Sequence, residues 1–280
     1  KILEKLISPL LVVPLPCAST QHGFRPFRSP TTCLLPIVTQ AINGFNANKP
    51  PIRTAVVALD LSKAFDSVDH TLLLRKISDS TLGSNLVLWL AAWLRGRTAS
   101  CLFRSASSPK MIIHAGVPQG SVLSPDVYNF NVNDFPNEPP LIPVDPPRVE
   151  PSFADDFHVG ESSPSLPAIE TALNDDLSHV ARWADEKKLT IAPEKSGMIL
   201  FTPDQAQFRY HPQVFFRGTL IPLKKALKML GITFDTKLTG KDHIAEAAGK
   251  GDRRLPILKA LAGTDWGHHQ ELLLQTYKCL

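Results

Sequence analysis

The chain of 280 residues is long enough for one large domain or two small ones, and its 43% hydrophobic content excludes a disordered protein. Proline is frequent, at 25 residues, but no periodic glycine accompanies it, which excludes collagen. The longest apolar run, residues 86–94, is far shorter than the roughly 20 residues that cross a bilayer. We therefore expect no membrane-spanning helix and no membrane partner.

The four cysteines and the first residues indicate the compartment and the context of the chain. No cysteine spacing is typical of a zinc site or a disulfide framework, which indicates a reducing, intracellular environment. The first residue is Lys1, and Pro9, Pro14 and Pro16 are expected to break any helix of a signal peptide. We expect the chain to begin inside a longer protein.

The net charge of +4 is unevenly distributed. Residues 1–59 carry +5, residues 60–160 carry −3, and residues 217–259 carry +6. Basic flanks around an acidic middle suit a protein that holds a polyanion beside a metal-binding centre. Ordinary solvated surface charge remains the alternative explanation.

In chain order, the predicted helices and strands alternate irregularly, which favours an α+β fold over a doubly wound parallel sheet. Ser29-Pro30 is typical of a helix start and predicts a helix to about residue 46, kinked at Pro36. The β-branched, apolar residues 54–61 predict a buried strand. Further predictions are helices at 70–78, 85–94 and 124–135, a hairpin of strands 99–103 and 110–115, a proline-rich connector at 136–151, and a strand–turn–strand unit at 152–160.

The remaining sequence continues this mixed pattern. Residues 166–189 predict a long helix with Asp175, Asp176 and Glu186 facing outward. Strands are expected at 198–202 and 226–234, and helices from residue 241 to the end of the chain.

Carboxylates stand where strands end. Asp60 lies near the end of the buried strand, and Asp155-Asp156 occupies the predicted hairpin turn. Two Mg²⁺ ions in phosphoryl transfer require such hard oxygen ligands on a rigid backbone. Aspartate is also common in turns for purely structural reasons. Asp60 is the stronger signal, because an unpaired buried carboxylate costs several kcal/mol unless a cation compensates it.

The order of the motifs along nearly the whole chain resembles the reverse transcriptase domain of non-LTR, LINE-type retrotransposons of the jockey-like type. The corresponding segments are QHGFR (21–25) with the Ser-Pro-Thr that follows, ALDLSKAFDSVDH (58–70), GVPQGSVLSP (116–125), FADD (153–156), Trp183 to Leu189 with Lys195, KMLGITFD (228–235) and ILKALAGTDWG (257–267). These segments resemble, in order, the block before motif A, motifs A to E, and the start of the thumb.

The resemblance implies a metal site and a mechanism. Asp60 and Asp155 would be the main ligands of two Mg²⁺ ions, for which Mn²⁺ is a possible substitute. Asp156 would support or join them, and the backbone carbonyl of Leu61 would also face a metal. Lys195 matches the lysine proposed to protonate the leaving pyrophosphate, although it also suits an ordinary surface position.

The resemblance also implies substrate contacts. Phe65 matches the steric gate that excludes a ribose 2′-hydroxyl, although it also suits a core position. Gln119 and Gly120 would line the dNTP pocket. Arg25 would meet the template, or simply lie on the surface, and Gly231 belongs to the primer grip.

The implied architecture is a right-hand polymerase with an antiparallel palm sheet backed by helices. Residues 1–53 would form partial fingers. Residues 54–224 would form the palm, with remaining fingers helices at 70–115, and residues 225–280 the primer grip and start of the thumb. The implied partners are an RNA template, a DNA primer and dNTPs, and the implied location is the nucleus. An N-terminal fingers block of the Arg-Pro-Ile-Ser-Leu type is not found in these residues.

Two other functions stay open at this point. A viral-type RNA-dependent RNA polymerase is disfavoured by Phe65 and by Ala154, which stands where that family has glycine before its two aspartates. An inactive retroelement relic that binds nucleic acid without turnover is disfavoured by the intact aspartates.

Overall fold

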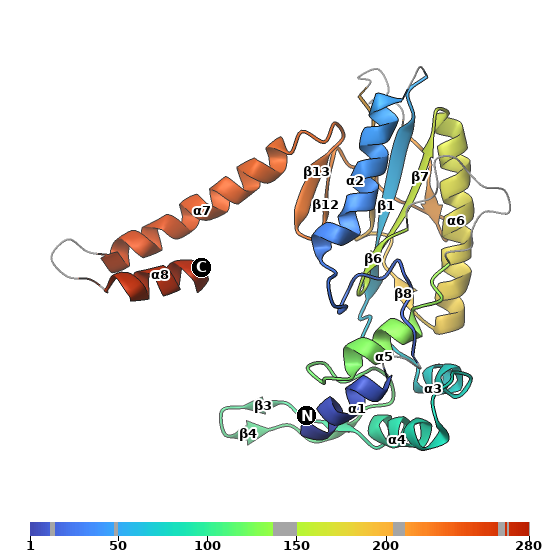
Figure 1. Cartoon of the computed structure of the whole chain (residues 1–280), viewed down its shortest axis with the longest axis vertical. Helices are drawn as coiled ribbons and strands as arrows, with labels where there is room; N and C mark the ends of the chain where they lie inside the picture. Colours follow the sequence, from blue (N-terminus) through green and yellow to red (C-terminus); the bar gives the residue numbers. More distant parts are fainter. Residues whose placement is uncertain are drawn as a thin grey trace.

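A computed structural model describes residues 1–11, 15–47, 50–136, 150–203, 211–262, 267 and 269–279. Most of the predicted proline-rich connector and part of segment 257–267 lie outside the described residues. The described chain is a mixed α+β fold whose helices surround an antiparallel sheet (Figure 1). No helix in these ranges is long and apolar enough to cross a membrane.

The sheet is built around one strand, β1 (Arg53–Ser62). Along one edge β1 pairs with β7 (Asp156–Ser163), and β7 continues to β6 (Ser152–Phe153). Along the other edge β1 pairs with β9 (Gly197–Phe201) and, at its end, with β8 (Thr190–Ile191). All these pairings are antiparallel, so the predicted strand and the predicted strand–turn–strand unit are confirmed.

Two hydrophobic clusters cover the opposite faces of the sheet, because alternate residues of a strand point to opposite sides. Val56 packs with α2 (Pro30–Asn46), while Val57 and Leu59 share a cluster with the inner side of α6 (Leu166–Lys187). The apolar residues of β1 are therefore buried on both faces, as a continuous apolar strand predicts.

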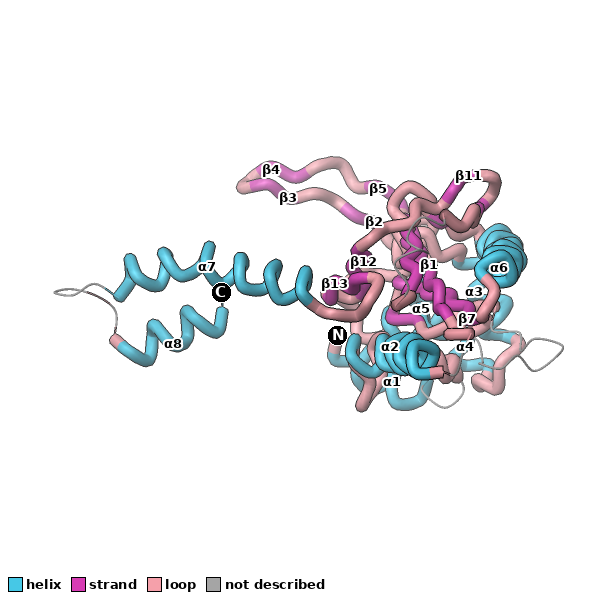
Figure 2. The backbone as a smooth tube through the Cα atoms, turned by 90° about the horizontal axis from the view of Figure 1, so that it is seen from above, coloured by secondary structure: helices cyan, strands magenta, loops and turns pink. Residues whose placement is uncertain are grey.

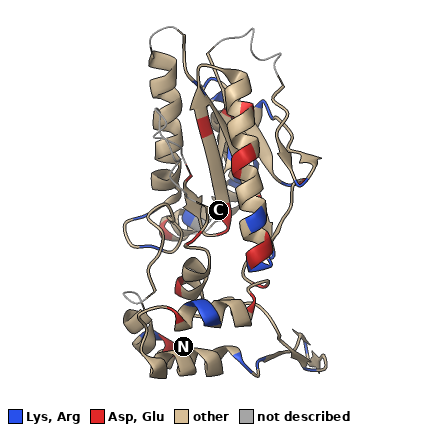
Figure 3. Ribbon diagram, turned by 90° about the vertical axis from the view of Figure 1, so that its right-hand side faces the viewer, with Lys and Arg blue, Asp and Glu red and all other residues tan. Residues whose placement is uncertain are grey.

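The two covering helices differ in charge. The helix α2 begins at a Ser29 capping box and carries no charged residue, whereas α6 presents acidic and basic side chains (Figure 3). The helix α2 runs from residue 30 to 46 and contains Pro36. On α6 the outward prediction is wrong for Asp176, which is 4% exposed and packs on the inner side of the helix.

The first helix, α1 (Ile2–Leu11), forms although it contains Pro9, contrary to the expected helix break. Its Ile7 and Leu11 are buried in the larger core cluster. The Glu4 carboxylate accepts hydrogen bonds from the Val122 backbone N–H at 3.0 Å and from the Ser121 hydroxyl at 3.1 Å. Tertiary burial and these bonds outweigh the local cost of the proline.

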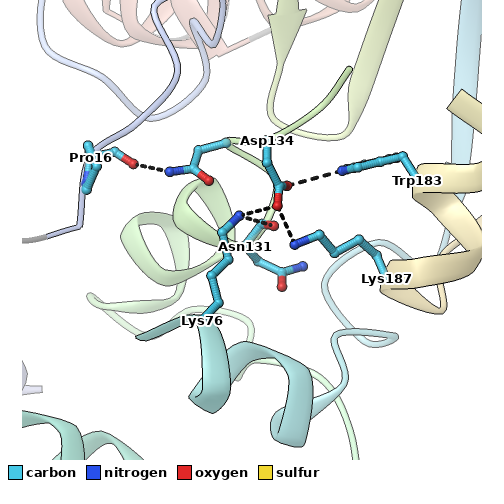
Figure 4. A network of polar contacts seen from close by, with 7 residues as sticks. Pro16, Lys76, Asn131, Asp134, Trp183 and Lys187 are labelled. Atoms are coloured by element: carbon cyan, nitrogen blue, oxygen red, sulfur yellow. Dashed lines mark hydrogen bonds and ion pairs between the residues drawn. The ribbon is translucent and has the colours of Figure 1, made fainter. Parts of the chain in front are cut away.

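Below the sheet lie α3 (His70–Ser78), α4 (Ser84–Leu94) and α5 (Ser124–Asn131) (Figure 1). The carboxylate of Asp134 connects this group to α6. It pairs with Lys76 of α3 at 2.9 Å and with Lys187 of α6 at 2.6 Å, and it accepts a hydrogen bond from the Trp183 indole at 3.1 Å (Figure 4). Burial opposes ionisation of Asp134, but its lysine partners outweigh that effect and lower its pKa.

The segment between α4 and α5 is a hairpin, but a more broken one than predicted. The ladders are short: β2 (Thr98–Ala99) with β5 (Met111–Ile112), and β3 (Leu102–Phe103) with β4 (Ala106–Ser107). All these strand residues are exposed, so little packing exists to extend the ladders.

The last part of the chain forms small hairpins and two helices. The single strand predicted at 226–234 is wrong, because Leu230 and Gly231 turn the chain between β12 (Ala226–Met229) and β13 (Ile232–Asp235). A second hairpin joins β10 (Phe215–Phe216) to β11 (Thr219–Leu220). The predicted C-terminal helices are α7 (Lys241–Ala262) and α8 (Gln270–Cys279).

The N-terminal segment around Gln21 is hydrogen-bonded to the turn between β6 and β7. The buried side chain of Gln21 accepts hydrogen bonds from the backbone N–H groups of Gly23 and Ala154, at 2.7 and 2.8 Å, and donates to the Ala154 carbonyl at 3.1 Å. Gly23 lies so close to the turn that a Cβ atom there would meet the Ala154 nitrogen at 2.3 Å. This close approach holds the turn in one position.

Replacing Asp134 by alanine should lower the free energy of unfolding by about 1 to 2 kcal/mol, because two largely buried ammonium groups lose their partner while the carboxylate itself is half exposed. Urea denaturation measures this change. The control is Asp175→Ala on the exposed side of α6, which should have almost no effect. Equal losses in the two variants would contradict the prediction.

Replacing Gly23 by alanine should destabilise the fold by about 1 to 3 kcal/mol, because the added methyl group collides with the backbone of the β6–β7 turn. Thermal and urea unfolding test this. Gly249→Ala is the matched control: nothing lies near a Cβ there, and it should be neutral or stabilising because alanine favours helix. A stable Gly23→Ala chain would show that the turn is not held in this way.

Candidate active site

The predicted carboxylates meet at one end of the sheet. In the register of β1 and β7, Asp60 lies directly opposite Asp156. Asp155 stands in the turn just before β7, next to Ala154, whose φ of 55° is unusual for a residue other than glycine. Asp60 and Asp156, far apart in the chain, are thus neighbours because β1 and β7 are antiparallel partners.

Negative charges are crowded at this end of the sheet. Although part of the Asp156 side chain is exposed, loss of hydration against the surrounding protein raises the pKa of its carboxyl to about 6, and the charges of Asp155 and Asp60 act in the same direction. Asp60 is less buried than its strand suggests, with a side chain 44% exposed, so the burial cost expected for it is reduced. The Lys195 ammonium lies 4.0 Å from its carboxylate.

The carboxylates at this end of the sheet fit a divalent cation whose remaining ligands come from water and substrate. Within the described ranges, no three His, Cys, Asp or Glu side chains gather closely enough to hold a metal by themselves. Mg²⁺ typically uses one or two protein carboxylates and completes its shell with water and substrate phosphates. Asp60 and Asp155 supply suitable hard ligands at one end of the sheet, so the residues fit Mg²⁺ bound together with a phosphate substrate.

An aromatic stack lies beside the carboxylates. The Phe65 ring stacks on Tyr128 of α5 with centroids 4.3 Å apart, and the edge of Phe24 approaches it at 5.9 Å. Tyr128 is fully buried, whereas Phe65 is half-buried. Phe65 therefore packs against the core, and its role as a steric gate stays a prediction.

The loop at residues 116–120 is bonded to the segment that carries Phe65. The Val117 N–H donates to the Phe65 carbonyl at 2.8 Å, and Gly116, with φ of 90°, packs against the backbone of Asp66. The Gln119 amide donates to the Asp66 carboxylate at 3.1 Å. Gly120 has φ of 78° and open space around it, so a side chain is disfavoured there by conformation rather than by contact.

The other candidate residues are placed differently. Leu61 is buried, next to Asp60 in β1. One guanidinium nitrogen of Arg25 donates to the carbonyls of Ala18 and Gln21, so this side chain braces the N-terminal segment. Gly231 lies at the turn of the separate β12–β13 sheet.

Three supporting residues had no predicted role. Gln21 fixes the aspartate turn, Tyr128 supports the Phe65 ring, and the Ser196 hydroxyl accepts a hydrogen bond from the Asp60 N–H at 3.3 Å. Gln21 belongs to a quoted motif, QHGFR, in which only Arg25 received a role. The Tyr128 contact depends on how α5 lies against the turn that follows β1, which no local pattern reveals.

Comparison with known proteins agrees with the family that the sequence motifs resemble. The family model described as "Reverse transcriptase (RNA-dependent DNA polymerase)" matches residues 1–234. The RNA-directed DNA polymerase from mobile element jockey of Drosophila melanogaster is 32% identical over 249 residues, covering 87% of this chain and 26% of that protein. The probable RNA-directed DNA polymerase from transposon X-element of the same organism is 29% identical over 250 residues, covering 88% of this chain and 26% of that protein. The chain thus spans about a quarter of these relatives.

Solved structures show the same fold. Telomerase from Candida albicans, in complex with a fragment of telomeric RNA, matches with a TM-score of 0.55 at 11% identity, covering 86% of this chain and 38% of the other. Telomerase from Candida tropicalis matches with a TM-score of 0.54 at 12% identity, covering 79% of this chain and 33% of the other. Because the family model covers most of the sequence and the ordered motifs agree with it, the chain belongs to the reverse transcriptase (RNA-dependent DNA polymerase) family, alongside members from jockey-type non-LTR retrotransposons.

Proposed function

We propose that the chain carries the catalytic centre of an RNA-directed DNA polymerase, which extends the 3′-hydroxyl of a DNA primer with dNTPs on an RNA template. The observation that carries the proposal is the pairing of Asp60 with Asp156 across β1 and β7, with Asp155 in the adjoining turn. Family membership supports the reaction class, and the basic charge of residues 217–259 suits a nucleic-acid backbone.

The same proposal assigns parts of a right hand to the fold. Residues 54–224 correspond to the palm, with fingers helices remaining in 70–115. Residues 1–53 correspond to partial fingers, and residues 225–280 to the primer grip and the start of the thumb. The telomerase likeness supports the fold alone. A non-LTR element that primes on genomic DNA would act in the nucleus.

The carboxylates account for the metal requirement. Asp60 and Asp155 would hold two Mg²⁺ ions, or Mn²⁺ in their place, with help from Asp156 and the Leu61 carbonyl. When bound, such ions lower the pKa of the attacking hydroxyl and stabilise the charge that develops on the phosphates. The crowded negative charge of the three aspartates supports cation binding at this edge.

The remaining candidates would position and select the substrate. Lys195, whose ammonium lies 4.0 Å from the Asp60 carboxylate, would donate a proton to the leaving pyrophosphate. Phe65 would exclude a ribose 2′-hydroxyl, with Gln119 and Gly120 lining the same pocket. Arg25 has further guanidinium nitrogens for a template contact, and Gly231 would face the primer.

Replacing Asp155 by asparagine should abolish Mg²⁺-dependent primer extension, with a loss of about 100-fold or more, because the amide cannot supply a charged ligand. The assay uses an RNA template, a DNA primer and dNTPs. Asp175→Asn, on the exposed side of α6, should retain full activity. A chain that binds the primer–template but never extends it, with or without a restored N-terminal fingers segment, would instead be the inactive relic.

Replacing Phe65 by alanine should raise the incorporation of rNTPs relative to dNTPs by about tenfold or more, because the ring that collides with the 2′-hydroxyl is removed. Single-nucleotide extension with dNTPs and rNTPs in parallel measures this ratio. Phe157→Leu, a change in the buried core on β7, is the control for a general loss of packing. An unchanged ratio in Phe65→Ala would show that this ring is only a core residue.

A further inference from the structure

An exposed hairpin that carries none of the catalytic motifs projects from the fold. We call residues 95–114 the arm. Its two short ladders, β2 with β5 and β3 with β4, are joined by a hydrogen bond from the Ser108 N–H to the Cys101 carbonyl at 2.9 Å. Figures 1 and 2 show the arm leaving the body of the molecule on the same side as α7. Every residue from 98 to 112 is exposed, so its side chains are not used to build the core.

The tip of the arm displays apolar and aromatic side chains. Leu102 is 73% exposed and Phe103 is 71% exposed, and at the base Met111 is 69% exposed. The guanidinium of Arg104 lies over the Phe103 ring, 5.5 Å from its centroid. Arg104 also occupies a turn position with φ of 52°, where glycine or asparagine is usual. The tip thus presents an exposed ring with a cation over one of its faces.

The arm has charge of only one sign. Between Asp79 and Asp126 the sequence contains no Asp or Glu. The cations in this interval are all on the arm: Arg95, Arg97, Arg104 and Lys110. In Figure 3 this hairpin carries Lys and Arg and no acidic residue. A hairpin that carries four cations, with no acid nearby in the sequence, is complementary to a polyanion.

We propose that the arm binds an unpaired nucleic-acid strand. The Phe103 ring stacks on a base, Arg104 at the same tip contacts a neighbouring phosphate, and Lys110, nearer the base of the arm, contacts a phosphate farther along the strand. A double helix keeps its base faces covered and offers only phosphates to this surface, which would leave the exposed ring without a use. An aromatic ring between cations is the combination that binds single strands without a sequence requirement. An acidic protein partner would satisfy the cations but not specifically the flat ring.

Only the identity of the bound nucleic-acid strand rests on the proposed function. In that reaction the unpaired strand is the RNA that has not yet been copied. The location of the arm supports this, because α7, which carries Lys250, Arg253 and Arg254, extends from the same side of the molecule. Binding itself requires neither metal nor turnover, so it is measured separately from catalysis.

The test is fluorescence anisotropy of a labelled 12-nucleotide RNA of mixed sequence with the full chain, without metal. Phe103→Ala should weaken binding about fivefold or more, whereas Phe103→Tyr, which keeps the ring, should bind like the original chain. Arg104→Gln should reduce the slope of log affinity against log salt by about 0.7. Phe215→Ala, at another exposed aromatic on the β10–β11 hairpin, should change nothing. Unfolding curves of all variants should coincide, since the arm residues are exposed.

Two outcomes would contradict the proposal. If Phe103→Ala binds the RNA as tightly as the original chain, or weakens binding to an RNA–DNA duplex as much as to the single strand, the proposal is wrong. Asp155→Asn separates the two proposals, because it should abolish extension, whereas Phe103→Ala should still weaken RNA binding by the same factor when the two changes are combined. Arm-dependent RNA binding in a chain that never extends a primer would overturn the proposed function and leave the arm's role intact.

Discussion

The antiparallel pairing of β1 with β7 is the constraint on which the candidate site depends. It extends from Arg53 opposite Ser163 to Asp60 opposite Asp156. Because side chains alternate along a strand, a shift of this register by one residue would exchange the β1 residues that pack with α2 for those that pack with α6. The buried Val56, Val57 and Leu59 resist such a shift on both faces of the sheet. Burial of the strand therefore also fixes the position of the carboxylate at its end.

The segments around the carboxylates are held by contacts between distant parts of the chain. Gln21 and Gly23 fasten the turn that carries Asp155, while Tyr128 of α5 supports Phe65. The Asn129 amide, also on α5, donates to the Gly23 carbonyl at 2.9 Å. One helix thus contacts both the aromatic stack and the segment behind the aspartate turn. This geometry provides the rigid backbone that a catalytic carboxylate requires.

The charges of the molecule fall into three arrangements with different consequences. The carboxylates at the end of the sheet repel one another and favour a bound cation. The Asp134 network does the opposite, since one half-exposed carboxylate pairs with two largely buried lysines and joins α3 to α6. The arm has cations with no acid near them in the sequence, so its charge is available to a partner. The overall charge of +4 conceals all three arrangements.

The sequence by itself determined the central elements and the chemistry of the candidate site. The start of α2 at Ser29-Pro30, the apolar run of β1 and the turn at Asp155 all follow from local rules of capping, periodicity and turn formation. The ordered motifs also indicated the family that the comparisons confirmed. Only the tertiary structure decided that α1 forms despite Pro9, that Asp176 is buried and that Arg25 braces the backbone. It likewise revealed Gln21 and Tyr128 as supports of the site. Each of these depends on contacts between residues far apart in the chain, whose free energy exceeds local preference and leaves no periodic pattern in the sequence.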